Sequence, residues 1–506
     1  MKIERTKNAG RNLKWGLVNK IVGLVLPFVC RAAIIRIFGI NYLGLNNLFT
    51  SILSTLSLAE LGFGSAVVFF MYRAVAENDV EKTCALMNYY KKVYRVVGVV
   101  ILVIGLALIP FLHTFIKKDV PTDINIYVVY ILTLLGTVVS YFLFAYKNCI
   151  LDAYQRKDII LNVNTVVLFV EKILQLVFIF ITKNYYMYLV AIVLTNIANN
   201  VITAIIVKKR YPQYCAKGTL EKTEKKEIGK KIQGLFLYKI GNVVFGSADN
   251  IVMSAFLGLA VTGVYGNYYY IITTLFAFLG IYYNAIRAGI GNSLIMESKE
   301  KNYHDFKQLQ FIQSWVVGWC TVCLLCLFQD FIVLYAGEEN VFDISVVISL
   351  CLYFYVWKII DVVNVYKEAG GMWDRDKFRP LVSGAVNLTL NIFFVQIIGI
   401  YGIIFSTILS QVIIDLPWAP KALISYFDIK GKEFYKCLLK GYLDLILMAV
   451  PTYLICIFIN FNPLVNLLIK APLCLIVPNA IFMLINHKSV VFKSAIFKIR
   501  GMFKLN

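Results

Sequence analysis

The sequence predicts an all-α integral membrane protein with about fourteen transmembrane helices. The 506-residue chain is 59% hydrophobic and its mean hydropathy is +0.73, well above the values of soluble domains. Apolar stretches of about 20 residues, the length that crosses a bilayer, follow one another along almost the whole chain. No hydrophilic domain separates them. The function is therefore confined to chemistry within a membrane or across it.

Each apolar stretch can be assigned approximate limits, and thirteen or twelve spans remain open alternatives to fourteen. We expect spans at 15–38, 43–71, 93–116, 124–150, 158–182, 185–207, 232–258, 263–292, 311–336, 343–366, 380–398, 400–426, 438–460 and 463–486.

The formal charge of +21 is distributed in a way that indicates membrane orientation. Lys and Arg gather in alternate loops, with 36 on one side of the predicted spans and 3 on the other. This is the positive-inside bias, and it places both termini in the cytoplasm. Cytoplasmic loops account for the charge, so we expect no nucleic acid among the partners.

The span pattern repeats within the chain. Sliding the first six spans by 219 residues superposes them on the next six, and it pairs Lys20 with Lys239 and Gly39 with Gly258. Two such bundles with the same orientation form a parallel repeat, which places a substrate cavity between the halves. The expected organisation is an N-terminal six-helix bundle at 1–207, a basic cytoplasmic linker at 208–231, a second six-helix bundle at 232–426, and two additional helices with a basic tail at 427–506.

Polar residues inside spans are functional candidates, because a charge at mid-bilayer costs about 2.5–3.5 kcal/mol on insertion scales. The first span carries Lys20, Gly23, Pro27 and Arg31 on one helical face, and the seventh carries Lys239, Asn242, Gly246 and Asn250. A stripe of this kind suggests a helix that faces the cavity, with Pro27 and Gly246 as hinge candidates. The two Lys side chains have a second interpretation, since they could reach the headgroups instead.

Other intramembrane charges have more specific interpretations. Asp249 could hold a proton or a sodium ion, or pair with an Arg of the other half. Lys358 and Asp361 are three residues apart on one helix and could neutralise each other. Arg287 has no partner at helical spacing, so it is the better candidate for ligand contact.

Enzyme motifs are absent from the sequence. There is no GxxxxGK[ST] phosphate loop, HExxH or GxSxG pattern, so we expect a protein that is not an enzyme and needs no cofactor. Cys320, Cys323 and Cys326 are spaced as in a metal motif, but no fourth ligand is close in sequence and they lie within a predicted helix. We expect them to pack as small apolar residues, with no disulfide and no metal site.

Two segments resemble a known family. Residues 44–95 (GLNNLFTSILSTLSLAELGFGSAVVFF…) and 247–269 (SADNIVMSAFLGLAVTGVYGNYY) are similar to the two half-signatures of bacterial Wzx-type polysaccharide flippases. That family is the polysaccharide branch of the multidrug/oligosaccharidyl-lipid/polysaccharide exporter superfamily. The resemblance implies a MATE-like fold of two pseudo-symmetric six-helix bundles. It also implies residence in the bacterial cytoplasmic membrane.

The resemblance further implies a function. Such a protein moves undecaprenyl-pyrophosphate-linked oligosaccharide to the outer leaflet by alternating access, for exopolysaccharide, capsule, O-antigen or teichoic-type glycans. It would contact membrane lipids and act beside polysaccharide polymerase and glycosyltransferases. The resemblance implies that Arg31, Asp249 and Arg287 line the family's cationic cavity, and it implies this more loosely for Lys20 and Lys239. Asn250 is a candidate because it belongs to the polar stripe of the seventh span.

Other functions stay open at this stage. They are a drug/ion antiporter of the same superfamily, a lipid II flippase, a membrane-embedded transferase, or a scaffold within a glycan assembly complex. The transferase is disfavoured by the lack of a catalytic loop.

Overall fold

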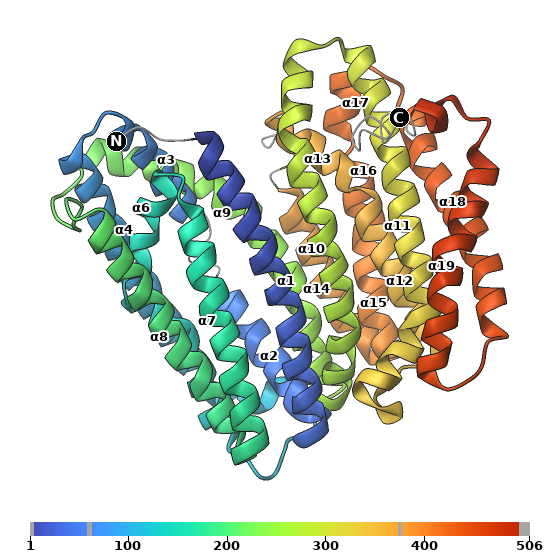
Figure 1. The fold of residues 1–506 in the computed structure, drawn as a ribbon, viewed down its shortest axis with the longest axis horizontal. Helices are drawn as coiled ribbons and strands as arrows, with labels where there is room; N and C mark the ends of the chain where they lie inside the picture. Colours follow the sequence, from blue (N-terminus) through green and yellow to red (C-terminus); the bar gives the residue numbers. More distant parts are fainter. Residues whose placement is uncertain (1–4, 58–62, 373–375, 377, 495–506) are drawn as a thin grey trace. The chain divides into compact units, whose positions relative to one another are not determined.

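A computed structural model describes residues 5–57, 63–372, 376 and 378–494, without the side chains of 5–10, 13, 65, 231 and 233–245. The described part is helical, and the chain divides into two compact units, Met1–Gly263 and Val264–Asn506. Each unit is considered by itself (Figure 1).

The N-terminal unit contains nine α-helices and the start of a tenth among its described residues. They are α1 (Arg5–Ile37), α2 (Ile40–Leu56), α3 (Phe63–Ala76), α4 (Val80–Ala107), α5 (Ile126–Phe142), α6 (Asn148–Ala153), α7 (Lys157–Val177), α8 (Tyr185–Arg210), α9 (Lys222–Phe256) and α10 (Leu259–Met296), with short helical turns η2 (Ile109–Phe115), η3 (Ala145–Lys147) and η4 (Phe178–Thr182).

The C-terminal unit contains the rest of α10 and the helices that follow it. They are α11 (Lys299–Ala336), α12 (Ile344–Ile359), α13 (Asp361–Ala369), α14 (Arg379–Ile398), α15 (Ile400–Ser410), α16 (Leu416–Trp418), α17 (Lys421–Phe427), α18 (Gly431–Ile457) and α19 (Pro463–Asn486), with the 3₁₀ turn η5 (Glu338–Asn340) and the π-turn η7 (Gln411–Asp415).

Each of the fourteen predicted spans overlaps one or more of these helices. Ten described helices are long and apolar enough to cross a membrane, or twelve if each of two bent pairs is one span. Two predicted spans are not among them. Span 43–71 contains residues 58–62, which lie outside the described residues, and the side chains of 233–245 in span 232–258 are likewise undescribed. The predicted all-α membrane fold is confirmed.

The repeat of 219 residues appears in the backbone. Gly39 separates α1 from α2 with φ 99°, and its counterpart Gly258 separates α9 from α10 with φ 104°. A positive φ favours glycine because it has no Cβ. The same residue type therefore makes the same sharp turn at equivalent places in the chain.

The repeat also forms a reciprocal contact within the N-terminal unit. A Cβ added to Gly44 would overlap the carbonyl oxygen of Leu259, and a Cβ added to Gly263 would overlap that of Ile40. Because 44 and 263, and likewise 40 and 259, are 219 residues apart, the two contacts are equivalent. Small residues let the N-terminal turns of α2 and α10 cross at backbone distance.

The boundary between the compact units follows from the packing of α9. Its C-terminal half contacts α2, where Asn250 donates a hydrogen bond to Ser51 Oγ at 3.0 Å. The division by contacts therefore falls after α9. The domain limits 1–207, 208–231, 232–426 and 427–506 describe the sequence repeat, and they stay a prediction.

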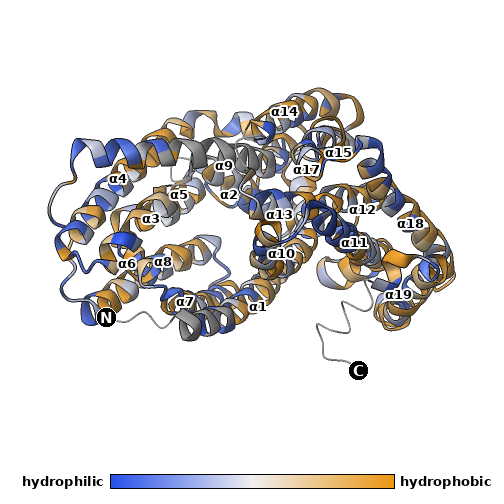
Figure 2. Ribbon diagram, turned by 90° about the horizontal axis from the view of Figure 1, so that it is seen from above, coloured by the Kyte–Doolittle hydropathy of each residue, from blue (hydrophilic) through white to orange (hydrophobic). Residues whose placement is uncertain are grey.

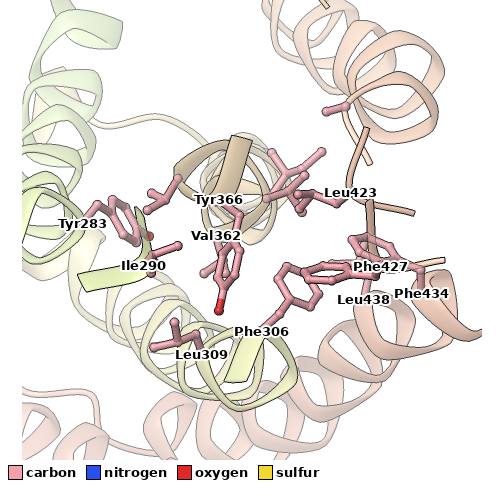
Figure 3. Packing of buried hydrophobic residues seen from close by; sticks show 14 residues of the cluster. Tyr283, Ile290, Phe306, Leu309, Val362, Tyr366, Leu423, Phe427, Phe434 and Leu438 are labelled. Carbon is pink, nitrogen blue, oxygen red and sulfur yellow. The ribbon is translucent and has the colours of Figure 1, made fainter. Parts of the chain in front are cut away.

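Apolar residues serve two purposes in this fold. Inside the C-terminal unit, a cluster around Phe306, Tyr366, Phe427 and Phe434 joins α11, α13, α17 and α18 (Figure 3). The outward sides of helices such as α18 and α19 are also mainly hydrophobic (Figure 2). In a soluble protein such surfaces would aggregate, whereas in a bilayer they contact lipid.

Candidate functional site

The N-terminal unit brings together residues of the two predicted stripes. Arg31 on α1 is half-buried, and its Nη1 lies 3.3 Å from Asn47 Oδ1 on α2. One helical turn along α2, Ser51 Oγ accepts the hydrogen bond from Asn250 on α9. Because Asn47 and Ser51 are four residues apart, they share a face of α2. We call Arg31, Asn47, Ser51 and Asn250 the α2 polar cluster.

Further contacts fix the α2 polar cluster in place. Asn47 Nδ2 donates to the carbonyl oxygen of Thr262 on α10 at 3.3 Å, so one amide joins α1, α2 and α10. Asp249, the neighbour of Asn250, is only 7% exposed. The arrangement places a guanidinium, two amides, a hydroxyl and a carboxylate on neighbouring helices inside a membrane protein.

The sequence pattern indicates Arg31, Asp249 and Asn250 as site residues, but it does not single out Asn47 and Ser51. A signal for them existed. Residues 46–54 (NNLFTSILS) place small polar side chains in every turn of an otherwise apolar helix. That pattern indicates a buried polar face.

The structure brings none of the other candidates of the N-terminal unit (Lys20, Lys239, Pro27 and Gly246) into a described side-chain contact with the α2 polar cluster. Lys20 is exposed in the structure, and the side chain of Lys239 lies outside the described residues. Pro27 lies inside α1, which is unbroken from Arg5 to Ile37. Gly246 lies on an exposed part of α9, and a Cβ added there would meet open space. The hinge roles of Pro27 and Gly246 stay predictions.

A second polar group of the N-terminal unit joins α7 and α8. Lys172 Nζ lies 2.6 Å from Glu171 Oε1 and 2.9 Å from Gln175 Oε1. Thr195 on α8 donates to Glu171 Oε2 at 3.2 Å. The two charges neutralise each other, which favours a structural role for this group.

In the C-terminal unit, Arg287 has a partner that sequence reasoning did not find. Its Nη2 lies 2.6 Å from Glu368 Oε2, and the two side chains are 42% and 21% exposed. Glu368 comes from α13, so helical spacing within α10 could not reveal it. Arg287 therefore belongs to an ion pair between α10 and α13 that is only partly buried.

The pairing of Lys358 with Asp361 is confirmed. The Nζ and Oδ2 atoms are 2.8 Å apart, and the Lys358 ammonium also lies 4.0 Å from the centre of the Phe276 ring. The aromatic face adds a cation–π contact. Both observations favour a structural pair.

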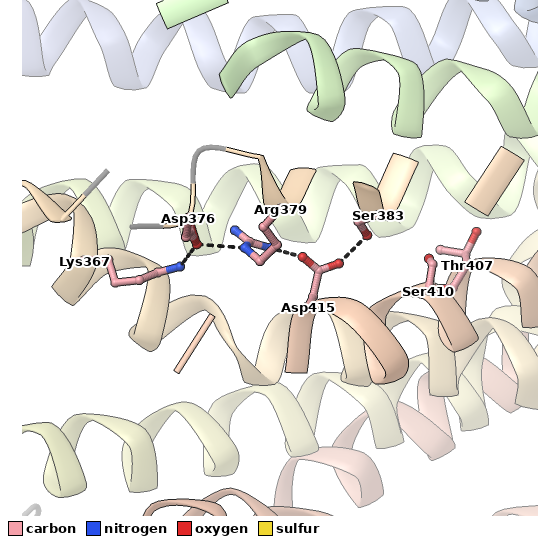
Figure 4. Close-up of polar contacts among 7 residues, drawn as sticks. All are labelled: Lys367, Asp376, Arg379, Ser383, Thr407, Ser410 and Asp415. Atoms are coloured by element: carbon pink, nitrogen blue, oxygen red, sulfur yellow. Dashed lines mark hydrogen bonds and ion pairs between the residues drawn. The ribbon is translucent and has the colours of Figure 1, made fainter. Parts of the chain in front are cut away.

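A larger charge network lies at one end of α13, α14 and α15 (Figure 4). Asp376 accepts hydrogen bonds from Lys367 and from Arg379 Nε, the latter at 2.8 Å. Arg379 also pairs with Asp415, whose second oxygen accepts a hydrogen bond from Ser383 at 2.5 Å. All five side chains are buried.

The position of Asp415 has a local cause. It closes the π-turn η7, and Pro417 follows two residues later. Proline lacks an N–H and disturbs the helical ladder in the preceding turn, and π-turns are often found at functional sites. We attribute the inward direction of Asp415 to this irregular turn.

The network also sets the ionisation of Asp376, which lies between α13 and α14. Burial raises the pKa of its carboxyl, but Arg379 and Lys367 outweigh that effect and hold the pKa below its ordinary value of 3.8. Asp376 is therefore charged at neutral pH.

Buried polar residues continue from this network along α14. Asn387 donates to Thr407 Oγ1 on α15 at 3.0 Å, and Asn391 donates to Asn387 Oδ1 at 3.3 Å. Ser383, Asn387 and Asn391 are four residues apart. That spacing was visible in the sequence, although its partners on α15 were not.

A profile of the polysaccharide biosynthesis protein family matches residues 9–286, which is more than half of the chain. The chain belongs to this family. The family predicted from the two half-signatures is thereby confirmed. A comparison with curated proteins gives no match.

Solved structures of low sequence identity share the fold. The lipid II flippase MurJ in an inward closed conformation has a TM-score of 0.67 at 14% identity, covering 94% of this chain and 98% of its own. An inward-facing multidrug resistance MATE transporter of the MOP superfamily has a TM-score of 0.60 at 14% identity, covering 83% and 94%. A mutant of the Vibrio cholerae MATE transporter VcmN has a TM-score of 0.54 at 14% identity, covering 84% and 97%. The polysaccharide biosynthesis family member described here is thus a multi-pass membrane protein with the fold of these transporters.

Proposed function

We propose that this chain is a flippase for undecaprenyl-pyrophosphate-linked oligosaccharide. It takes repeat units made at the cytoplasmic face and presents them at the outer leaflet for the synthesis of a cell-surface polysaccharide such as an exopolysaccharide. Family membership supports a role in polysaccharide biosynthesis, and the shared fold is that of membrane transporters. The observation that carries the proposal is the α2 polar cluster, with Arg31 at its centre.

The chemistry of the substrate explains why an arginine is needed. A sugar pyrophosphate cannot cross hydrocarbon unless its lost hydration is replaced by other polar partners. A guanidinium offers several N–H donors in a planar fork that matches phosphate oxygens. The amides of Asn47 and Asn250 can accept hydrogen bonds from sugar hydroxyls or donate to them. The prenyl tail stays in lipid.

The same role extends to the other cationic candidates. We propose Arg287, Lys20 and Lys239 as further contacts for the pyrophosphate during alternating access between the two halves of the repeat. Arg287 would leave Glu368 when the substrate arrives. Its side chain is 42% exposed, so it can exchange one partner for another.

We propose the membrane potential as the driving force. An inside-negative potential is worth about 2.3 kcal/mol per charge per 100 mV. Two net negative charges moving outward therefore gain about 4–5 kcal/mol per 100 mV with no coupled ion. Coupling of a proton or sodium ion through Asp249 is the alternative.

The location completes the proposal. The protein would lie in the bacterial cytoplasmic membrane with both termini in the cytoplasm, which follows from the 36 Lys and Arg residues on that side against 3 on the other. Polysaccharide polymerase and glycosyltransferases would act beside it. It would perform no covalent chemistry itself.

A second candidate is a lipid II flippase, because MurJ, which is named as one, shares the fold over 94% of this chain. A drug/ion antiporter is a third, because the MATE transporters share the fold as well. The candidates differ in cargo, so a cargo experiment separates them.

The experiment is transport by the purified full-length protein in proteoliposomes. Separate vesicles would contain a labelled undecaprenyl-pyrophosphate oligosaccharide, lipid II, or an encapsulated cationic dye. The proposal expects flipping of the oligosaccharide carrier, faster with an inside-negative potential at constant ion gradients. Flipping of lipid II alone, or dye efflux without any lipid flipping, would contradict it. An unchanged rate after the potential is dissipated would contradict the proposed driving force.

A further inference from the structure

Three buried cysteines converge from three helices of the C-terminal unit. Cys326 lies on α11, Cys456 near the end of α18 and Cys474 on α19, and their side chains are 6%, 2% and 0% exposed. Among the described residues, their Sγ atoms all lie within 4.8 Å of one another. We call them the thiol cluster. Sequence reasoning saw Cys326 only with its neighbours on α11, since the other two thiols are more than a hundred residues away.

The backbone carbonyl of Cys474 lacks its helical hydrogen bond and is bonded by side chains of α11 instead. Pro478 stands four residues after Cys474 in α19 and has no N–H to donate to the Cys474 carbonyl. Two side chains of α11 supply donors instead. Trp319 Nε1 donates to that carbonyl at 2.9 Å, and the Cys323 thiol donates at 3.9 Å. A missing helical bond thus attaches α19 to α11 beside the thiol cluster.

The helices are also held on the other side of the thiol cluster. Asp330 is four residues after Cys326, and Lys470 is four residues before Cys474. Their Oδ2 and Nζ atoms are 2.7 Å apart, and Asn466 donates to the other Asp330 oxygen at 2.7 Å. The register of α19 on α11 is therefore set above and below the three sulfurs. A site held in this way is preorganised for a ligand.

The spacing of the sulfurs suits three-coordinate metal binding. With metal–sulfur bonds of about 2.3 Å, a trigonal site needs about 4.0 Å between sulfurs, and the observed limit of 4.8 Å requires only small side-chain shifts. Zinc in structural sites takes four ligands in a tetrahedron. Among the described residues, three sulfurs lie within 4.8 Å of one another, and the Cys323 thiol lies beside Cys474 without joining that group. Soft thiolates also select Cu(I).

We propose that the thiol cluster binds one Cu(I) ion, which staples α18 and α19 to α11. On binding, the three thiols release their protons to solvent and the three thiolates bond to the copper ion. Three positive charges leave and one enters, so the net charge of the site falls by two. Copper binding is therefore expected to strengthen as the pH rises. The proposal goes beyond the proposed transport function and does not rest on it.

The test is Cu(I) binding to purified full-length protein in detergent, under anaerobic reducing conditions, in competition with a chromophoric Cu(I) chelator. Wild type is expected to retain about one ion per chain against the chelator, and Cys326→Ser and Cys474→Ser are expected to lose it. Cys351→Ser is the matched control, because Cys351 is a buried thiol of α12 outside the cluster. Equal binding by wild type and both cluster variants would overturn the proposal.

A second measurement covers the case in which the variants fail to fold. X-ray absorption on copper-loaded wild type is expected to show a first shell of three sulfurs. Cu(I) is also expected to raise the melting temperature of wild type and of Cys351→Ser alike. A shell that contains nitrogen or oxygen, or no binding by wild type, would show that the three thiols only pack against one another.

Discussion

Two regions of the molecule differ in their polar partners: the α2 polar cluster contains amides and a hydroxyl, whereas Arg379 lies between two carboxylates. In the C-terminal unit, Arg287, Lys358 and Arg379 each lie within ion-pair distance of a carboxylate. In the N-terminal unit, the α2 polar cluster includes contacts between neutral groups and its arginine, as for Arg31 with Asn47, and contacts between neutral groups alone, as for Asn250 with Ser51.

The difference teaches which buried charges to suspect of a function. The fully buried ion pair of Arg379 with Asp415 supports the fold, because either partner is left uncompensated when the other is removed. Amides and hydroxyls exchange partners at lower cost, since they carry no net charge. The α2 polar cluster is thus the better place for a ligand, and the network of Arg379 is the better place for a structural support.

The largest expected effect is on stability in the C-terminal unit. Arg379→Met leaves Asp415 buried without its guanidinium, which is expected to cost about 3–5 kcal/mol. The matched variant Asn47→Ala, which removes a neutral partner from the α2 polar cluster, is expected to cost about 1–2 kcal/mol. Thermal unfolding of both purified variants measures this. Equal destabilisation would break the comparison between the units.

The repeat predicts the next effect. Gly44→Ala drives a methyl group into the carbonyl of Leu259, and Gly263→Ala does the same at Ile40. Each is expected to lower stability by about 1–3 kcal/mol, as overpacking does. Gly246→Ala is the control, since its Cβ meets open space. Its stability should be unchanged or higher, and a loss of transport without loss of stability would support the hinge role of Gly246.

Arg287 is the intermediate case, because it has a carboxylate partner and is also a proposed substrate contact. Its ion pair is partly exposed, so Arg287→Ala and Glu368→Gln are each expected to change stability by about 1 kcal/mol or less. Transport separates the two roles. If Arg287 binds the substrate, Arg287→Ala loses flipping while Glu368→Gln keeps it. An equal loss in both would make the pair purely structural.

The smallest effect belongs to a surface pair of the N-terminal unit. Lys82 Nζ lies 2.7 Å from Glu224 Oε1, and this hydrogen bond holds the pKa of the Glu224 carboxyl below its ordinary value of 4.5. A depressed pKa stabilises the folded state above pH 4.5, and the contribution is lost as the pH falls through the folded-state pKa. Glu224→Gln should cost about 0.2–1 kcal/mol at neutral pH, less at high salt, and nothing at low pH. A pH-independent cost would contradict this.

Hydropathy and charge were enough to predict most of the fold, because in a membrane a span must be apolar, helical and about 20 residues long. The repeat could also be predicted, and Gly39 with Gly258 shows it in the backbone. Breaks inside spans could not. The π-turn that ends at Asp415 and the change of helix between Ile359 and Asp361 depend on local packing and backbone details that average hydropathy does not contain.

The candidate site also has residues that the sequence can identify and partners that it cannot. Arg31 and Asn250 could be named because a polar residue in an apolar span is conspicuous. Their partners Asn47 and Ser51 depend on how α1 and α9 lie against α2, which is tertiary information. For the same reason, helical spacing led to Asp361 as the partner of Lys358 but not to Glu368 as the partner of Arg287.

The measurement that tests the central claim most directly is the rate at which proteoliposomes flip a labelled undecaprenyl-pyrophosphate oligosaccharide, with wild type, Arg31→Lys and Arg31→Ala compared at equal folded protein. Loss of a charge-assisted contact costs about 2 kcal/mol or more, so Arg31→Ala should be slower by about 30-fold or more. Arg31→Lys, which keeps the charge but not the fork, should lie between the two. Flipping by Arg31→Ala at the wild-type rate would contradict the account.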